Sequence, residues 1–391
     1  MKKIEAKIIA DSINDKGNRV TTFILTFPRF ILAELNTHRM FSKNSASSRA
    51  IPFEKMLKMV EEDPFIPIAW QKDHKGMQGT EYFTNERISN YSANLDGNEA
   101  VYQLNEEWLG ARNCAVEQAK NMNQLGLTKQ LVNRLLEPFM WHTVLLTATE
   151  FDNFFKLRCP SYGGFAKNGE NTAFRSKKDV KKHFEAIGLK SDVVDSQNFY
   201  SWQSINTSGT EIHMQALAES MWDAYNENEP TLLKDNEWHI PFGDQMNDQE
   251  IYDKFLAPNN FDYNLGRINQ IKVQISTARC ARLSYMTFDG KIDYDKDMEL
   301  HNTLANSGHL SPFEHCCKAM SELEYYSYIK GKYPTGVEKT GNIFNYERYA
   351  KFVEDDEDWV GFIGENPNNK DLYGWCDNFR GFISYRHLLN G

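Results

Sequence analysis

Apolar and polar residues alternate near the start of the chain before changing to a helical spacing. Residues 22–27 place phenylalanine or leucine at every second position, as expected of a half-buried strand. Pro28 stands where a first helical turn tolerates proline, and apolar residues at roughly helical spacing then run to Leu35. We therefore expect a strand, a short helix and then a polar loop over residues 37–49.

Apolar residues three and four positions apart predict several longer helices. They span residues 101–125, 129–137, 148–159, 211–225 and 295–308. Thr128 is a suitable N-cap for the second of these helices. Pro138 and Pro160 would each end a helix, and Gly308 would stop the last one. Residues 271–285, IKVQISTARCARLSY, predict a strand.

Three hydrophilic segments separate these elements. Residues 160–207 are rich in Gly, Lys and Ser, residues 226–268 are acidic, and residues 331–372 are hydrophilic. We interpret all three as insertions in one elaborated domain that spans residues 1–391. The sequence contains no internal repeat and no low-complexity tract.

The composition is that of a folded protein. Hydrophobic residues make up 41% and aromatic residues 13% of the 391 residues, which is enough for a sizeable core and unlike a disordered chain. The formal net charge of −10 argues against a broad basic face for nucleic acid. A local basic pocket for one small anion is compatible with this charge.

The six cysteines form no pair with the spacing of a zinc finger, and no histidine pair has helical metal-ligand spacing. We therefore expect no metal site and reduced thiols in a cytoplasmic protein. No apolar run approaches the length of a membrane span, and the first residues lack the apolar core of a signal peptide. The sequence indicates neither export nor a membrane partner.

The segment THRMFSKNSASSR, residues 37–49, concentrates hydrogen-bond donors directly after the apolar run. Arg39 and Arg49 can each form two hydrogen bonds with a phosphate or a ring carbonyl. Ser47, Ser48 and free backbone N–H groups can add to them. A solvated surface loop is the alternative interpretation.

Three further segments combine polar groups with apolar surroundings. Arg134 lies among leucines and needs an anion or an acidic partner, for which Glu137 is a candidate. Asn153 and Arg158 are five residues apart, about 140° around an ideal helix, and would lie on either side of a ligand. His315, in SPFEH, is on its own best interpreted as a structural histidine bonded to the backbone.

Together these segments resemble the flavin-dependent thymidylate synthases, whose signature is RHRxxSxNExSxR. The segment THRMFSKNSASSR keeps six polar positions of that signature: His38, Arg39, Ser42, Asn44, Ser47 and Arg49. It has Thr37 in place of the first arginine and Ser45 in place of the glutamate. The apolar lead-in also resembles that of the family, with Glu34 where the family usually has glutamine.

Other segments resemble further motifs of the same family. NRLLEP, with Arg134, resembles AR-x-x-LP, and EIHMQALA resembles EIRxxA. TATEFDNFFKLR, with Asn153 and Arg158, resembles N-x-R-x-x-x-N-F-x-x-x-R without its first N-x-R pair. ARLSY and SGHLSPFEH, with Ser284 and His315, resemble a segment that precedes the RHR loop in the family but follows it here. The order of the motifs therefore resembles a circular permutation, which proteins tolerate where the termini are close and at the surface.

The resemblance implies an α+β fold with a central, mostly antiparallel sheet flanked by helices, permuted and with helical or loop insertions. It also implies a homotetramer that uses FAD, NADPH and methylenetetrahydrofolate to convert the pyrimidine deoxynucleoside monophosphate dUMP to dTMP. Catalytic roles would fall to Arg158, Arg49 and Ser47. The implied flavin ligands are His38, Arg39, Asn44, Asn153, Ser284 and His315. The implied nucleotide ligands are Glu34, Ser45, Ser47, Arg49, Arg134 and Arg158.

The departures at Thr37 and Ser45 leave two alternatives open. A changed base site could direct a flavin- and folate-dependent 5-hydroxymethylation of dUMP or dCMP. Loss of family polar positions could instead leave a non-catalytic nucleotide-binding relative, although Arg49 and Arg158 are both retained.

Overall fold

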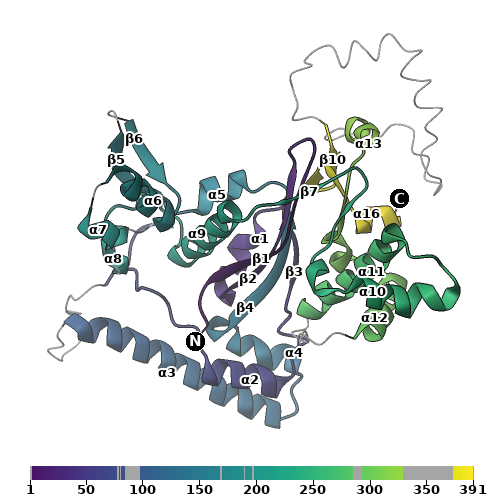
Figure 1. Cartoon of the computed structure of the whole chain (residues 1–391). Helices are drawn as coiled ribbons and strands as arrows, with labels where there is room; N and C mark the ends of the chain where they lie inside the picture. Colours follow the sequence, from purple (N-terminus) through teal and green to yellow (C-terminus); the bar gives the residue numbers. More distant parts are fainter. Residues whose placement is uncertain are drawn as a thin grey trace, which may run out of the picture.

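A five-stranded sheet lies at the centre of the molecule in the computed structural model (Figure 1). The structure describes residues 2–76, 79, 81–83, 97–167, 170–188, 190–195, 198–284, 293–328 and 373–390. The strands, in spatial order, are β3 (Ser42–Ser45), β4 (Trp141–Ala148), β2 (Arg19–Pro28), β1 (Glu5–Asn14) and β7 (Thr231–Leu233). All neighbouring strands are antiparallel except β1 and β7, which are parallel. The expected α+β class with a mostly antiparallel central sheet is confirmed, whereas the permutation stays a prediction.

One face of the sheet packs against three helices. Phe23, Leu25 and Phe27 of β2 point to this face and are fully buried, so the predicted strand is confirmed. The helices are α1 (Leu32–Asn36), α5 (Asp152–Arg158) and α9 (Ile212–Glu227). The 3₁₀ turn η1 (Arg29–Ile31) follows Pro28 and leads into α1, as the sequence predicted. This face therefore brings α1, with the segment that follows it, close to α5.

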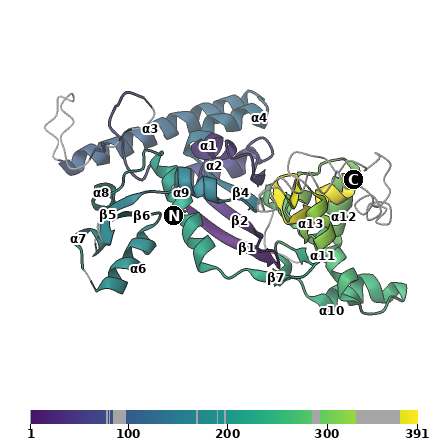
Figure 2. The same cartoon turned by 90° about the horizontal axis from the view of Figure 1, so that it is seen from above.

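The opposite face of the sheet packs against another group of helices. Leu145 and Ile24 join a core with α10 (Asp248–Ile251), η4 (Tyr252–Leu256), α11 (Leu265–Ser284) and α12 (Tyr294–Asn306). The short turns η3 (Gly243–Gln245) and η5 (Ala257–Asn259) flank α10 and η4. Figure 2 shows α10–α12 and the C-terminal elements on the other side of the sheet from α6–α8. The predicted helix 295–308 is confirmed as α12, and Gly308 takes a φ of 71° just after it.

Two further groups of elements have hydrophobic clusters of their own. The first comprises α2 (Phe53–Glu62), α3 (Gly97–Gln124), α4 (Lys129–Val132) and η2 (Asn133–Phe139). The second, within the expected insertion 160–207, comprises β5 (Tyr162–Lys167), β6 (Glu170–Phe174), α6 (Lys177–Ile187), α7 (Asp192–Asp195) and α8 (Phe199–Gln203). A separate cluster is compatible with an insertion, which stays a prediction here, as does the insertion at 226–268. The segment 331–372 lies outside the described residues.

A smaller sheet joins the middle of the chain to its C-terminal part. Its strands are β8 (Trp238–His239), β9 (Cys317–Ala319) and β12 (Phe382–Ser384). Around it lie η6 (Ser311–Glu314), α13 (Glu322–Ser327), the hairpin β10 (Trp375–Cys376) and β11 (Phe379–Arg380), and α16 (Tyr385–Asn390). SPFEH, which contains η6, thus leads directly into this sheet, and η6 contacts β3 of the central sheet.

The strand predicted over residues 271–285 is wrong, because this segment belongs to helix α11. Residues 275–281 are all buried, so this part of the helix has no exposed face from which its period could be recognised. Two of its buried hydroxyl groups bond to backbone carbonyls. Ser276 donates to the carbonyl of Pro241 over 2.6 Å, and Thr277 donates to the carbonyl of Val273 over 2.8 Å.

Three other boundaries also differ from the predictions. The loop 37–49 contains the edge strand β3, which pairs with β4. The helix expected over 129–137 is α-helical only to Val132 and continues as the 3₁₀ helix η2 through Pro138. The helix expected over 148–159 begins at Asp152, since the strand β4 extends to Ala148. The helices predicted at 101–125 and 211–225 are confirmed as α3 and α9.

Candidate functional site

Arg158, at the end of α5, gathers side chains from α1 and the segment that follows it. Its Nε donates to His38 Nε2 over 3.0 Å, and one terminal nitrogen donates to Thr37 Oγ1 over 3.3 Å. The other terminal nitrogen lies 3.7 Å from Glu34 Oε2. Because a guanidinium only donates, His38 Nε2 must accept, and the ring proton of His38 therefore sits on Nδ1.

His38 is fixed between aromatic rings. Its ring meets that of Phe154 edge-on at 4.9 Å and stacks on that of Phe41 at 5.8 Å, measured between centroids. Burial, with the nearby charges of Arg158 and Lys43, lowers the pKa of His38 to about 4. His38 is therefore neutral near pH 7 and serves as an acceptor that orients Arg158.

Lys43 is a member of this cluster that the sequence did not single out. Its Nζ donates to the backbone carbonyls of Leu35, over 3.3 Å, and His38, over 3.1 Å. Burial lowers the pKa of Lys43 to about 8. In β3, Lys43 lies opposite Leu146, so it points to the sheet face that carries α1 and α5. This orientation could be inferred only from strand β3, which the sequence did not predict.

Glu211 and His213, at the start of α9, complete the acidic side of the cluster. Glu211 caps the helix by accepting from the backbone N–H groups of His213 and Met214, each over 2.9 Å. His213 Nε2 accepts from the N–H of Ile68 over 3.0 Å, so its Nδ1–H donates to Glu211 in a close contact. Burial and the charge of Glu211 raise the pKa of Glu34, against the opposing effect of Arg158. The sequence identified this segment only as the EIHMQALA motif.

The cluster presents one fixed donor beside one acceptor. Arg158 is a permanent cation with one terminal nitrogen beside Glu34, and its side chain remains 23% exposed. The Glu34 side chain is 38% exposed. A planar ring with an acceptor next to a donor on its edge could bind to both groups at once.

On the opposite face of the sheet, a buried chain of side chains ends at His315. Ser12 Oγ lies 2.9 Å from His239 Nδ1, and His239 Nε2 lies 2.8 Å from Thr22 Oγ1. Thr22 and Thr147 are 2.8 Å apart, and Thr147 lies 2.8 Å from His315 Nδ1. His315 thus bonds to a hydroxyl rather than to the backbone carbonyl that its local sequence predicted. These hydrogen-bonded side chains join β1, β2 and β4 to the smaller sheet.

Counting the protons shows in which direction the hydrogen bonds of this series run from donor to acceptor. Burial lowers the pKa of His239 to about 4 and that of His315 to about 3, so both rings are neutral near pH 7. If Ser12 donates first, every hydroxyl has an acceptor and His315 keeps its proton on Nε2. The reverse direction leaves the Ser12 hydroxyl proton without an acceptor among the described residues. The first direction is therefore favoured, and it makes His315 Nε2–H a donor.

Buried polar atoms without partners gather at β3 and η6. His315 Nε2, Asn44 Nδ2 and Ser42 Oγ are buried and have no hydrogen-bond partner in the part of the chain that the structure describes. Ser42 and Asn44 lie opposite Thr147 and Leu145 in β4, on the face that meets His315. Two of these three residues, Asn44 and His315, are among the expected flavin ligands.

The two arginines expected to hold a phosphate lie at the far end of β3. Asn133 donates to the carbonyls of Ser48, over 2.7 Å, and Ile51, over 2.9 Å. The turn that carries Arg49 therefore packs beside η2, which carries Arg134. Both arginines are exposed, and neither forms an ion pair with another described residue.

The predicted pairing of Arg134 with Glu137 is wrong. Glu137 Oε1 instead accepts from Ser48 Oγ in a close contact and lies 3.7 Å from a terminal nitrogen of Arg29. Glu137 therefore tethers the 48–51 turn to the end of β2. Arg134 is left free to meet a ligand or a second subunit.

The remaining expected residues do not converge within one chain. Arg39 and Asn153 are exposed, and the Arg39 carbonyl accepts from Asn378 over 3.2 Å. Ser45 is half-buried and faces the α1 side of the sheet opposite Val144, whereas Ser47 is half-buried and its carbonyl accepts from the N–H of Ala50 over 2.9 Å. Ser284 ends α11, and its side chain lies outside the described residues.

No cysteine stands out as a nucleophile in this region. Cys159 follows α5 and is 4% exposed, and burial raises the pKa of its thiol well above the ordinary value. A protonated thiol is a poor nucleophile. The positions that could act on a substrate here are therefore cationic, acidic or hydroxyl groups.

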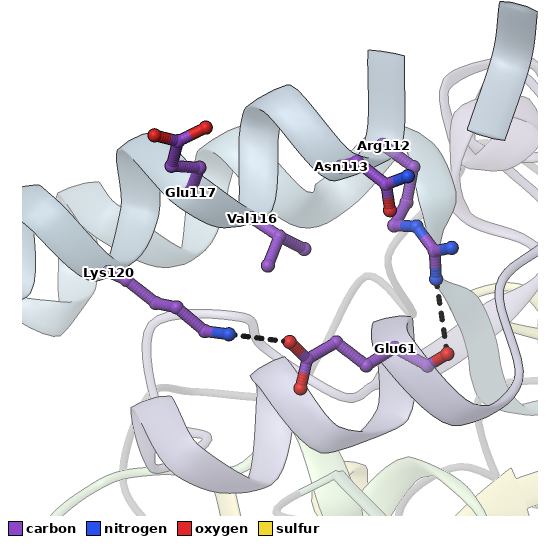
Figure 3. A pocket seen from close by; sticks show the side chains of 6 residues that line it. All are labelled: Glu61, Arg112, Asn113, Val116, Glu117 and Lys120. Carbon is purple, nitrogen blue, oxygen red and sulfur yellow. Dashed lines mark hydrogen bonds and ion pairs between the residues drawn. The ribbon is translucent and has the colours of Figure 1, made fainter. Parts of the chain in front are cut away.

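A surface groove of about 380 Å³ lies elsewhere, between α2 and α3 (Figure 3). Glu61, Arg112, Asn113, Val116, Glu117 and Lys120 line it. Lys120 Nζ contacts Glu61 Oε1 over 2.7 Å, and Arg112 donates to the carbonyls of Val60 and Glu61. None of the expected site residues lies there.

Comparison with known proteins gives limited similarity. No family model and no curated protein matches the sequence. The chain is similar to solved structures of a UMP/dUMP methylase, PolB from Streptomyces cacaoi. The structure bound with 5-Br UMP has 13% identity and a TM-score of 0.36, covering 58% of this chain and 90% of that chain. The structure bound with 5-Br dUMP has 12% identity and a TM-score of 0.33, covering 58% and 91%. A likeness of this size does not determine the activity of this chain.

Among the described residues, no helix is both long enough and apolar enough to span a membrane.

Proposed function

We propose that the chain is a flavin-dependent enzyme that methylates C5 of dUMP to give dTMP, with methylenetetrahydrofolate and NADPH as co-substrates. The observation that supports it most is the contact of Arg158 with His38, Thr37 and Glu34. These residues come from separate segments that resemble the nucleotide- and flavin-binding motifs of one enzyme family. A non-catalytic surface loop would not need so fixed a guanidinium.

Arg158 and Glu34 would recognise the pyrimidine ring together. Uracil offers a carbonyl oxygen to Arg158 and an N3–H to the Glu34 carboxylate. Cytosine offers N3 to Arg158 and its amino group to Glu34. The pair therefore suits either base, and 5-hydroxymethylation or methylation of dCMP is the second candidate reaction. In both cases Arg158 would stabilise negative charge that develops on the ring.

Arg49 and Arg134 would bind the phosphate of a nucleotide whose base lies in a neighbouring subunit. Arg49 follows β3 and Arg134 lies on η2 beside the same turn, whereas His38 and Arg158 lie at the beginning of β3, next to Lys43. One nucleotide would have to lie along the whole strand to reach both groups in a single chain. Two exposed arginines that form no ion pair with a described residue are suited to a site shared between subunits. The homotetramer is part of this proposal.

The groups around β3 and η6 fit a flavin. His315 Nε2–H and Asn44 Nδ2 are buried donors without described partners, and Ser42 Oγ can donate or accept. An isoalloxazine ring or a phosphate supplies the acceptors that these donors lack. FAD, when bound, would provide the hydride for the pyrimidine ring. One chain would hold the flavin by these residues, and His38, Arg39, Asn153 and Ser284 are proposed as ligands that a second subunit contributes.

The decisive experiment follows the hydrogen at C5. Purified protein loaded with FAD is incubated with 5-tritiated dUMP or dCMP, methylenetetrahydrofolate and NADPH. We expect release of tritium to water from dUMP, with a product heavier by one methyl group in mass analysis. Release from dCMP, or a hydroxymethyl product, would select the second candidate. Nucleotide binding without release from either substrate would leave a binding protein and refute the enzyme.

A further inference from the structure

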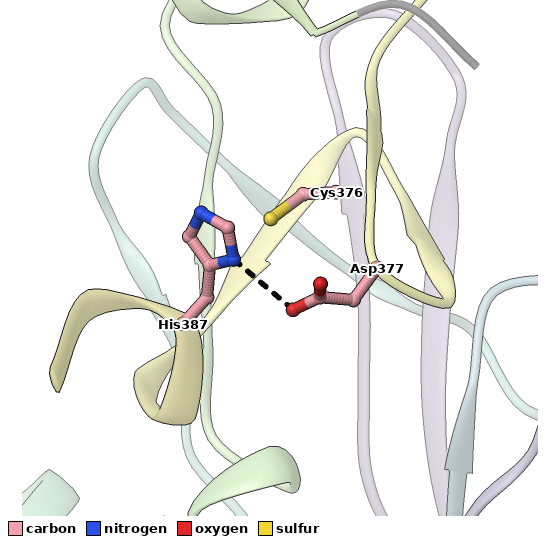
Figure 4. A group of neighbouring side chains, drawn as sticks. All are labelled: Cys376, Asp377 and His387. Atoms are coloured by element: carbon pink, nitrogen blue, oxygen red, sulfur yellow. Dashed lines mark hydrogen bonds and ion pairs between the residues drawn. The ribbon is translucent and has the colours of Figure 1, made fainter. Parts of the chain in front are cut away.

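Cys376, Asp377 and His387 form a compact group of potential metal ligands near the C-terminus (Figure 4). One ligand atom from each residue lies within 4.8 Å of the other two. Around a tetrahedral zinc ion the ligand atoms lie about 3.5 Å apart. A shift of roughly one ångström would therefore bring all three into coordination distance.

The backbone holds two of these ligands in place. Cys376 and Asp377 belong to the tight hairpin between β10 and β11, and Asp377 has a φ of 52° at its turn. This left-handed conformation is uncommon for residues other than glycine, asparagine and aspartate. The N–H of Gly381 donates to the carbonyl of Gly374 over 2.7 Å and closes the hairpin. The Cys376 thiol is thereby directed inward, 1% exposed, while the carboxylate of Asp377 stays at the surface.

The third ligand already faces the other two. His387 lies on α16, and its N–H donates to Ser384 Oγ over 3.2 Å. Its Nδ1 lies 3.1 Å from Asp377 Oδ2, and its Nε2 lies 3.3 Å from the hydroxyl of Tyr328. Histidines that bind metals through one ring nitrogen commonly bond through the other to a second group. Tyr328 supplies that group here.

We propose that Cys376 Sγ, Asp377 and His387 Nδ1 bind one divalent transition-metal ion, best suited to zinc. A thiolate, an imidazole and a carboxylate are the ligand types that zinc takes in proteins. Binding releases the thiol proton and moves the imidazole proton to Nε2, from which it donates to Tyr328. The thiolate and the carboxylate together balance the two charges of the ion.

The site differs from those around Arg158 and His315 and does not depend on the proposed reaction. Three of its potential ligands are among the described residues, so water or another ligand would fill the fourth position. The ion would connect the β10–β11 hairpin to α16. Since α16 directly follows β12 of the smaller sheet, the metal would fix the C-terminal elements against that sheet.

The test uses the full chain and the metal alone. The protein is freed of metal with a chelator and titrated with Co²⁺ and Zn²⁺. We expect about one ion per chain and a thiolate-to-cobalt absorption band in the near ultraviolet. Zinc should also raise the midpoint of thermal unfolding by about 5 °C.

Single substitutions test which residues bind the metal ion. Cys376→Ser should abolish the band, while Asp377→Asn and His387→Ala should weaken cobalt binding at least tenfold. Asparagine tolerates the left-handed turn, so Asp377→Asn keeps the hairpin even if Cys376→Ser disturbs folding. Cys114→Ser and His309→Ala, at exposed positions outside the group, should bind as the wild type does. A wild-type chain that takes up no cobalt, or a band that persists in Cys376→Ser, would overturn the proposal.

Discussion

Arg158 shows how one side chain can combine distant segments into a site. Its three partners, Glu34, Thr37 and His38, lie about 120 residues earlier in the chain and surround the guanidinium on three sides. The hydroxyl of Thr37 accepts from Arg158. Thr37 therefore positions the guanidinium, and Arg158 is the sole arginine in this cluster of described residues.

Glu34 predicts a pH dependence for the reaction. Burial and Glu211 raise its pKa above the usual 4.5, and the ionised carboxylate accepts more strongly from N3–H of uracil than the protonated group does. The acid limb of kcat/KM for dUMP should therefore lie above pH 4.5. Glu34→Gln keeps an acceptor oxygen that does not titrate, so this limb should disappear in pH profiles of the variant. An identical acid limb in both proteins would exclude Glu34 as the group that titrates.

His142 predicts how stability changes in acid. Both ring nitrogens lack a described partner, and burial lowers the pKa of His142 to about 3. Between pH 6.5 and 3 the unfolded chain binds a proton there that the folded chain does not, so the free energy of unfolding falls as the pH falls. His142→Leu removes this difference. Between pH 7 and pH 4, the free energy of unfolding of the variant should therefore fall by about 3 kcal/mol less than that of the wild type.

Urea unfolding at the two pH values measures this effect. His309→Ala, at an exposed position, is the matched control and should follow the wild type. Equal losses in His142→Leu and the wild type would mean that His142 does not contribute to acid lability.

At the scale of elements, Thr147 connects β4 to β2 and to the segment that leads into the smaller sheet. Its hydroxyl bonds to both Thr22 and His315, so it links the central sheet to the segment after η6. Thr147→Val keeps the shape but leaves His315 Nδ1 without a partner and breaks the bond to Thr22, which keeps only its contact with His239. We expect a loss of about 1–3 kcal/mol in unfolding free energy.

Thr143→Val provides the control for that variant. Thr143 lies on the same face of β4 and is half-buried, and its side chain forms no hydrogen bond with a described residue. Chemical denaturation should show a change within about 0.5 kcal/mol for Thr143→Val. A similar loss in both variants would assign the effect to strand packing rather than to the buried chain.

The elements also show which helices and strands can be predicted from the sequence. The strand 22–27 was predictable because its apolar side chains alternate, and the helices α3, α9 and α12 were predictable because their apolar residues recur three and four positions apart. Helix α11 was not, since residues 275–281 are buried on all sides and their order carries no amphipathic period. Strand β3 was missed for a different reason: its polar sequence, SKNS, forms a strand only because β4 offers an unpaired edge.

The candidate site was predictable only in part, for a related physical reason. Motif spacing identified Arg158, His38 and Glu34, which do meet, and Asn44 and His315, which lie on adjoining elements. It could not identify Lys43, Glu211 or His213, whose roles depend on orientation and on helix capping. Nor could it foresee that Cys376, Asp377 and His387 would converge, because their proximity follows from a tight turn and the direction of α16.

At the scale of the whole molecule, shared sites predict complementation between inactive variants. If each site takes Arg49 from one subunit and Arg158 from another, a coexpressed mixture of Arg49→Ala and Arg158→Ala chains forms some intact sites. Random assembly should restore about a quarter of the wild-type activity. Tritium release by the purified mixture, compared with each variant alone, measures the recovery. A mixture no more active than its components would place both arginines in one chain.

The most direct test of the central claim compares two variants of the same helix. Arg158→Ala removes the guanidinium that we assign to the pyrimidine ring, whereas Lys156→Ala removes an exposed cation two residues away. Both should fold as the wild type does, which circular dichroism can verify. Tritium release from 5-tritiated dUMP should fall at least about 100-fold in Arg158→Ala and stay unchanged in Lys156→Ala. Wild-type release in Arg158→Ala would contradict the assignment of this cluster as the active site.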